Sequence, residues 1–289
     1  PEQYEAVQGV LASGGATTLS AEDGISVRGG TITSGGDLSL TSNGGIDLGA
    51  LTSNSAASGD GTYASAVQNY GTTVTGKTDV TAIALGGNLS MEGSSLSAGG
   101  TATVMAAGDI TLQATTDSQY SSNTSSYTTG FLGSTTITTT NTASASQQQG
   151  SDLSATGDLT VVADGSLSAQ GSAQSAQDAT VTVGGDVSLT ATTDTSGWTY
   201  SRDKDGIFSG GDDYRSGSSS SNTPTLLAAV GNVSVTAGQP VSIWDLLFPP
   251  SQTLIAAPDP LTDLALLGTN TADYEFLQDE SYDTQTLPQ

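Results

Sequence analysis

The sequence predicts an all-β chain, folded as a right-handed parallel β-helix (solenoid) with extra-helical β-hairpin insertions. Three observations predict this fold: a short phrase recurs along the chain, glycine interrupts the chain at short intervals, and Ser and Thr are abundant. Hydrophobic residues make up 35% of the chain, below the roughly 45–50% of an ordinary globular domain. Such a composition suits either disorder or a solenoid with a narrow core, and the regular repeats favour the solenoid.

The recurring phrase is Gly-(Asp/Asn)-apolar-(Ser/Thr)-apolar, and each copy has the period-two alternation of a short β-strand. Glycine permits the backbone of a corner before each copy, where Asp or Asn bonds its own backbone. Short strands with such frequent corners suit a coil of three parallel strands that stacks on its neighbours. The six copies are GDLSL (36–40), GNLSM (87–91), GDITL (108–112), GDLTV (157–161), GDVSL (185–189) and GNVSV (231–235).

The apolar pair of each copy is predicted to point into the core, and the intervening Ser or Thr toward solvent. Coils stacked about 4.8 Å apart let each inward row pack on the next. Each buried Val, Leu or Ile then contributes on the order of 1.5–3 kcal/mol before entropy is subtracted. The predicted core pairs are Leu38/Leu40, Leu89/Met91, Ile110/Leu112, Leu159/Val161, Val187/Leu189 and Val233/Val235.

Three segments are too long to be corners, and we expect hairpin insertions near 54–79, 115–151 and 192–226. In the second segment, β-prone Thr, Ser, Tyr and Ile runs flank a turn at Gly130–Ser134. In the third, the turn falls around Lys204–Gly211. With about 20 residues in each uninterrupted coil, the remaining repeat region predicts six to seven coils.

The repeats are predicted to occupy residues 1–238. Residues 239–289 are Pro-rich and end in an acidic stretch, and proline forbids continued coils. We expect these residues to form a cap over the open end of the core, with a separate functional module as the alternative. The first residues have no basic region and no apolar region of a signal peptide, so we interpret the chain as a fragment of a longer protein.

The charge and composition exclude several classes of function. Five Lys and Arg residues oppose 29 Asp and Glu residues, a formal net charge of −24, so a nucleic-acid partner is not expected. The chain has no Cys and no His, which excludes Ser-His-Asp and Cys-His nucleophiles and the usual zinc sites. No apolar run of 18 residues predicts a membrane-spanning helix. No cofactor or metal is predicted.

Two acidic patterns resemble parts of calcium sites. Asp37 and Asp186 follow Gly-Gly pairs, but the nine-residue GGxGxDxUx spacing of a calcium β-roll is missing. We therefore expect both residues to form corners. Asp203-Lys204-Asp205-Gly206 resembles half of a calcium loop, but Tyr214 stands where the twelfth position requires an acidic ligand. A solvated, charged hairpin tip is predicted there.

Parallel β-helices also include polysaccharide lyases and hydrolases, which use paired carboxylates with a metal or a basic residue. Asp158, Asp164 and Asp178 are the available carboxylates. Only Arg28 and Lys77 lie outside the third insertion to stabilise developing charge. The chain is therefore predicted not to be an enzyme, and no catalytic residue is assigned.

Most aromatic residues lie in the insertions rather than in the coils. Exposed Tyr and Trp side chains stack on sugars or fill a pocket of a partner protein, so we consider these residues as partner contacts. The alternative is that each insertion folds back along the rod and covers its side with these rings. The candidates are Tyr63, Tyr70, Tyr120, Tyr127, Phe131, Trp198, Tyr200 and Phe208.

The alternation of G-D-[LIV]-[ST]-[LVI] coils with Ser/Thr-rich interruptions resembles the haemagglutinin-repeat region of filamentous-haemagglutinin-type exoproteins. The resemblance covers roughly residues 9–238 and is closest at 108–140 and 185–211. In that family, a coil ending in Ala and then Thr or Asp leads into a Ser-rich arm and then Ser-Gly-(Phe/Leu)-(Phe/Leu) or a variant. Thr129–Leu132 and Asp205–Phe208 look like the latter positions.

The resemblance implies a secreted or surface-attached fibrous protein of a Gram-negative bacterium, exported through an outer-membrane two-partner-secretion transporter. The expected function is a segment of a filamentous adhesin that attaches to a host or neighbouring-cell surface receptor or glycan. The alternative is a passive stalk segment of a contact-dependent-inhibition toxin exoprotein. The strong acidity of this chain argues against an anionic glycan as the partner.

Overall fold

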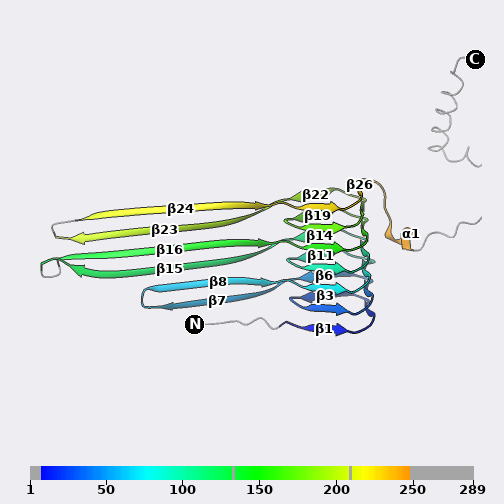
Figure 1. Ribbon diagram of the computed structural model, residues 1–289, viewed down its shortest axis with the longest axis horizontal. Coiled ribbons are helices and arrows are strands. Elements are labelled where there is room, and N and C mark those ends of the chain that lie inside the picture. Colours follow the sequence, from blue (N-terminus) through cyan, green and yellow to red (C-terminus); the bar gives the residue numbers. More distant parts are fainter. Residues whose placement is uncertain (1–7, 132–133, 208–209, 248–289) are drawn as a thin grey trace, which may run out of the picture. The chain divides into compact units, whose positions relative to one another are not determined.

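The computed structural model describes residues 8–131, 134–207 and 210–247, and it shows a rod of stacked β-coils with a further sheet projecting from it (Figure 1). Each coil has three sides, and the strands of one side pair in parallel with the equivalent strands of the neighbouring coils. The described residues form seven coils, the last of which lacks a strand on the third side. The predicted parallel β-helix with hairpin insertions is confirmed.

The three sides are numbered in the order in which the chain passes through them. The first side contains β1 (Val10–Ser13), β4 (Thr31–Ser34), β9 (Thr73–Gly76), β12 (Ser95–Ala98), β17 (Asp152–Ala155), β20 (Ala173–Ala176) and β25 (Leu226–Ala229). The second side contains β2 (Thr17–Ala21), β5 (Leu38–Ser42), β10 (Val80–Ala84), β13 (Ala102–Ala106), β18 (Leu159–Ala163), β21 (Ala179–Val183) and β26 (Val233–Ala237). The third side contains β3 (Gly24–Arg28), β6 (Gly45–Gly49), β11 (Leu89–Glu92), β14 (Ile110–Gln113), β19 (Leu167–Gln170) and β22 (Val187–Thr190).

Alternate residues of every strand point inward, so the core is a column of stacked apolar rows. The first four predicted core pairs, from Leu38/Leu40 to Leu159/Val161, are buried. The last two pairs belong to the sixth and seventh coils, and three of their side chains are 46–48% exposed. Their exposure follows from position, because within the described residues no strand stacks on the outer side of β22 or of β26.

Three hairpins leave the rod at the same corner, between the third side of one coil and the first side of the next. They follow the second, fourth and sixth coils, so one hairpin leaves at every second coil. The hairpins are β7 (Leu51–Gly59) with β8 (Thr62–Tyr70), β15 (Thr115–Thr129) with β16 (Thr135–Gln149), and β23 (Thr192–Gly206) with β24 (Gly211–Thr223).

The hairpins, which we call the first, second and third arm in chain order, pair with one another into one six-stranded antiparallel sheet, which we call the wing. β8 pairs with β15 and β16 pairs with β23. Neighbouring strands lie about 4.8 Å apart in parallel and in antiparallel sheets, so a hairpin occupies the height of two coils. Since a hairpin leaves at every second coil, the six wing strands fill successive levels without a gap. The wing extends away from the rod rather than along its side (Figure 1).

Residues 239–247 pack on the outer face of the second side. Ile243, the first residue of α1 (Ile243–Leu247), is fully buried against Met105 and Val162. Its backbone N–H donates a hydrogen bond of 2.8 Å to Asp164 Oδ1. Met105 and Val162 are neighbours in an outward-facing row, where the alternation predicts polar residues, and α1 shields this apolar row from water.

The predicted cap over the last coil falls mainly on residues 248–289, which lie outside the described residues. The described part of this segment lies beside earlier coils, against β13 and β18. The last coil keeps exposed apolar side chains, with Leu226 at 55% and Val235 at 48% exposed.

Candidate functional site

The corners of the rod are fastened by side chains that bond the backbone of the next coil. Asp79 Oδ1 accepts a hydrogen bond of 2.7 Å from the N–H of Thr101. Asn88 Oδ1 accepts one of 2.9 Å from Asp109, whose own Oδ1 accepts one of 2.8 Å from Ser166. These donors stand at corners, so each carboxylate or amide satisfies a backbone group. The recurring Asp and Asn residues therefore have a structural role.

Asp37 and Asp186, the residues that follow Gly-Gly pairs, also lie at corners. Asp37 accepts hydrogen bonds from the Thr78 hydroxyl and from the N–H of Asp79, and these bonds lower the pKa of Asp37. The N–H of Asp186 donates to Ser166 Oγ at 3.0 Å. Across the described residues, no group of three or more acidic side chains is arranged to hold a metal ion.

The carboxylates considered for catalysis occupy corners as well. Asp178 Oδ1 accepts a hydrogen bond of 2.5 Å from the N–H of Asn232, and Asp164 accepts the bond from Ile243. Arg28, one of the two cations outside the third insertion, forms an ion pair of 2.6 Å with Asp47. Asp178 and Arg28 thus bond to neighbouring coils and Asp164 bonds to α1, and none of these bonds brings two of the carboxylates together beside a cation. The described part of the chain also contains no helix that is long and apolar enough to cross a membrane.

The wing holds most of the aromatic residues that the sequence singled out. Tyr127 is 54% exposed and Trp198 is 49% exposed, whereas Tyr200 is half-buried. Phe131 lies just beyond β15 and is 86% exposed, and Phe208 lies outside the described residues. The sequence interpretation missed Tyr214 on β24, which is 66% exposed. The other exposed candidates on wing strands are Tyr63, Tyr70 and Tyr120.

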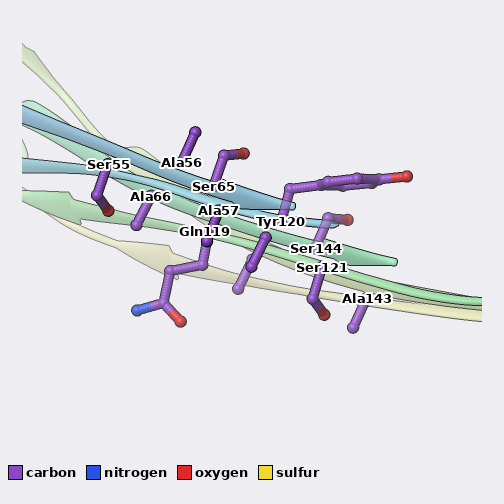
Figure 2. A pocket seen from close by; sticks show the side chains of 12 residues that line it. Ser55, Ala56, Ala57, Ser65, Ala66, Gln119, Tyr120, Ser121, Ala143 and Ser144 are labelled. Atoms are coloured by element: carbon purple, nitrogen blue, oxygen red, sulfur yellow. The ribbon is translucent and has the colours of Figure 1, made fainter. Parts of the chain in front are cut away.

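Strand alternation divides these residues between the two faces of the wing. By the strand register, Tyr63, Tyr120 and Tyr214 share one face, which we call the Tyr120 face. The opposite face, called the Trp198 face, carries the rest: Tyr70, Tyr127, Trp198 and Tyr200. Figure 2 shows this division, with Tyr120 pointing away from its neighbours Gln119 and Ser121. The predicted contact residues therefore do not form a single cluster.

On the Tyr120 face, the rings of Tyr63 and Tyr120 lie side by side across β8 and β15. Their centroids are 6.0 Å apart and their planes are inclined by 53°. This is the separation at which aromatic pairs attract. The pair joins the first arm to the second.

On the Trp198 face, the indole of Trp198 lies across β24 at Gly217. A Cβ placed on Gly217 would lie 2.5 Å from Trp198 Nε1, so only glycine leaves room for the ring. Tyr200 lies two residues after Trp198 on β23, and the guanidinium of Arg215 on β24 lies 5.9 Å from the centre of the Tyr200 ring. Trp198 thus rests on the sheet beside an Arg–Tyr pair, with about half of its surface open to solvent.

A shallow depression crosses the first four wing strands (Figure 2). Its lining is mostly Ala and Ser from both faces, and Gln119 and Tyr120 are its only long side chains. Small side chains leave the sheet flat here. The residues of the lining are Ser55, Ala56, Ala57, Ala64, Ser65, Ala66, Gln119, Tyr120, Ser121, Ala143, Ser144 and Ala145.

The third arm separates its charges between the two faces. Asp203 and Asp212 lie directly opposite each other on the Tyr120 face, with Asp205 beside them. Desolvation and the nearby Asp212 carboxylate raise the pKa of Asp203. The cations Arg202, Lys204 and Arg215 and the carboxylate of Asp213 lie on the Trp198 face. The predicted charged hairpin tip is thus two oppositely charged surfaces.

The separation of charges between the two faces has a signal in the sequence. Residues 202–205 read Arg-Asp-Lys-Asp, and a strand with this alternation carries cations on one face and anions on the other. The pairing of neighbouring arms also has a signal in the sequence. Each of the second and third arms begins with Ala-Thr-Thr-Asp, at 114–117 and 191–194.

Two family models match the chain. One, described as hemagglutinin repeat, matches residues 58–206, more than half of the chain. The other, described as haemagglutinin repeat, matches residues 5–50 and 182–239. No curated protein and no solved structure gives a significant match. The first model covers β8, the second arm and β23, and the second covers the first two coils, the third arm and the last coil.

Proposed function

Because this chain belongs to the haemagglutinin-repeat family, we propose that it is a segment of a filamentous adhesin whose wing attaches to other cells or surfaces. The family match supports a filamentous-haemagglutinin-type repeat region. The step from that region to attachment rests on the wing, and the rod serves to hold the wing in place.

The observation that carries the proposal is the joining of three separate insertions into one projecting sheet. A rod needs no such sheet for its own core, because the buried apolar column lies within the coils. The wing instead carries exposed aromatic side chains on both faces, among them Tyr127 at 54% and Trp198 at 49% exposure. Exposed Tyr and Trp give a large contact area at a small cost in side-chain entropy.

The partner is a receptor or glycan on a host or neighbouring cell, and no catalytic step is part of this function. We place the protein outside the cell or at the bacterial surface, after export through an outer-membrane two-partner-secretion transporter. Its family supports this route. The absence of Cys from the sequence also suits a chain that crosses a membrane unfolded and folds without disulfides.

The alternative is a passive stalk segment of a contact-dependent-inhibition exoprotein, in which the wing only stiffens the rod. The bonds between the second and third arms favour such bracing. The hydroxyls of Thr142 and Thr199 lie 2.5 Å apart and those of Ser146 and Thr195 lie 2.7 Å apart. Bracing and adhesion differ in whether the wing surface binds anything.

The test compares the 289-residue chain with a variant in which 51–70, 115–149 and 192–223 are replaced by short Gly-rich corners. Saturable binding of each labelled protein to epithelial and bacterial cells is measured, and circular dichroism shows whether the coils persist. Binding by the full chain alone supports the adhesin. If both proteins stay folded and neither binds, the segment is a stalk.

A further inference from the structure

The Trp198 face of the third arm holds an excess of positive charge on a strongly acidic protein. Three of the five basic residues of the whole chain, Arg202, Lys204 and Arg215, lie there on alternate positions of β23 and β24. We call these three residues, together with Trp198 and Tyr200, the basic patch. Alternate residues of a strand are about 7 Å apart, so from Trp198 to Lys204 the patch extends roughly 20 Å along β23.

One carboxylate balances these cations in part. Asp213 Oδ2 accepts a hydrogen bond of 3.0 Å from Arg215, and Asp213 also lies directly across from Arg202. Lys204 lies opposite Gly211, which has no side chain. The side chains of Arg215 and Asp213 remain 69% and 43% exposed. Counting one charge for each group, the tip half of this face carries an excess of two positive charges.

One charge pair of the third arm opposes the stability of the hairpin, although Arg202 and Asp213 form a favourable pair. Opposite charges across a strand pair stabilise a sheet, and like charges directly opposite destabilise it. The third arm nevertheless places Asp203 opposite Asp212 on one face, where the pKa of Asp203 is raised. Its cations collect on the other face. A pair that breaks a local rule without a structural gain is expected near functional surfaces.

Next to the cations, the patch offers a flat apolar surface rather than a cleft. The Trp198 ring lies over Gly217, and on its other side β16 presents Ala143 and Asn141 in the rows of Trp198 and Tyr200. A planar aromatic ring with small neighbours suits the apolar face of a sugar ring. Guanidinium groups bind carboxylates with two parallel hydrogen bonds.

We propose that the basic patch binds a glycan that carries carboxylate groups, with a sugar ring on Trp198 and the carboxylates at Arg202, Lys204 and Arg215. This inference names the ligand class of the proposed adhesin and rests on that function. It also revises the expectation from net charge, because the local surface is positive although the chain as a whole is not. An acidic peptide shares the charge but not the sugar ring.

The test uses a Trp244→Phe background, in which Trp198 is the only tryptophan. Three probes are titrated at low ionic strength while the fluorescence of Trp198 is recorded: a galacturonate oligosaccharide, a neutral maltooligosaccharide of equal length and an oligoglutamate peptide. We expect a saturable change with galacturonate only. Equal responses to oligoglutamate or to the neutral sugar would overturn the assignment to a carboxylated glycan.

Charge variants show which face binds. Arg202→Gln with Lys204→Gln and Arg215→Gln is expected to weaken galacturonate binding by tenfold or more. Asp203→Asn with Asp212→Asn, on the same strands but the other face, leaves binding equal or slightly tighter. Circular dichroism and hydrogen exchange of the wing amides check that the variants fold. If the fold of the triple variant is disturbed, the single variant Arg202→Gln takes its place in the binding test. A triple variant that folds and still binds overturns the proposal.

The failure of this inference is distinguishable from a failure of the proposed function. If galacturonate does not bind but the intact chain still binds cells and the wingless variant does not, the adhesin proposal stands and the basic patch is not its contact. If the intact chain binds no cells yet binds galacturonate through the basic patch, the ligand site stands without the adhesive role.

Discussion

The carboxylate of Asp117 accepts a hydrogen bond of 2.7 Å from the backbone N–H of Asn69 and thereby joins the base of the second arm to the first. The side-chain amide of Asn69 donates to the same oxygen at 3.1 Å. The third arm repeats the relationship, since Asp194 Oδ1 accepts a bond of 2.6 Å from the N–H of Gln148. Both Asp residues end an Ala-Thr-Thr-Asp sequence. This motif marks the point where one arm joins the preceding one.

Replacing Asp117 by Ala is expected to loosen the contact between β8 and β15 while the coils remain intact. The change removes a charge-assisted hydrogen bond to a backbone donor, and we expect opening of this contact to become easier by about 1 kcal/mol. Hydrogen exchange of the β8 and β15 amides measures it. Asp205→Ala, at the far end of the wing, is the matched control. Unchanged protection in β8 and β15 would show that Asp117 does not hold the arms together.

The third arm is expected to become more stable as the pH falls from 7 toward 4. The pKa of Asp203 is raised in the folded hairpin by desolvation and by the nearby Asp212 carboxylate. A folded state that binds a proton more readily than the unfolded state gains stability as the pH falls through the folded pKa. Protection of β23 and β24 amides, corrected for intrinsic exchange, therefore rises on acidification. Asp212→Asn reduces the rise, and an unchanged rise in that variant would argue against the carboxylate pair as its cause.

The corner at Asp37 is expected to respond to pH in the opposite direction. Hydrogen bonds from Thr78 and Asp79 lower the pKa of Asp37 below its ordinary value of 3.8. Its contribution to stability is therefore complete above that value and is lost as the pH falls through the lower folded pKa. Exchange of the Asp79 amide should accelerate only under strongly acidic conditions. Asp37→Asn removes that step, whereas acceleration already near pH 5 would contradict this origin.

The coils could be predicted from the sequence because their signal is local and repeated. Each copy of the phrase, such as Gly-Asp-Leu-Ser-Leu at 36–40, carries its own corner and its own inward pair. The hairpins could be predicted for the same reason, since β-prone runs flank a turn. The register of neighbouring coils then follows because inward apolar residues stack on one another, as Leu40 opposite Ala82 shows.

The wing could not be predicted in this way, because it depends on a match between distant parts of the chain. A hairpin has the height of two coils, and only the count of coils between insertions shows that the arms meet edge to edge. The division of Trp198 and Tyr120 between opposite faces follows from that register. The contact of Ile243 with Met105 and Val162 was equally hidden, because these residues only appear to interrupt the strand alternation.

Replacing Ile243 by Ser is expected to release residues 239–247 from the rod. Ile243 is fully buried against Met105 and Val162, and loss of such a side chain costs about 2–4 kcal/mol where it packs. Faster proteolysis within this segment, with unchanged circular dichroism of the coils, is the expected result. Leu246→Ser alters a residue that is 56% exposed and should have little effect. Equal cleavage of both variants would show that Ile243 is not the anchor.

Replacing Gln174 by Leu is expected to stabilise the rod. The inward row of the first side runs through Val74, Leu96, Leu153, Gln174 and Leu227, so an amide stands among apolar side chains. Gln174 is 5% exposed, and its Nε2 has no hydrogen-bond partner within the described residues.

A buried polar group without a partner costs about 1–3 kcal/mol, and Leu fills a similar volume. We expect the free energy of unfolding to rise by about 1–2 kcal/mol, measured by denaturant titration. Gln170→Leu, on the exposed end of β19, is the control and should leave stability nearly unchanged. A fall in stability for Gln174→Leu would show that the amide contributes a bond that the apolar row cannot replace.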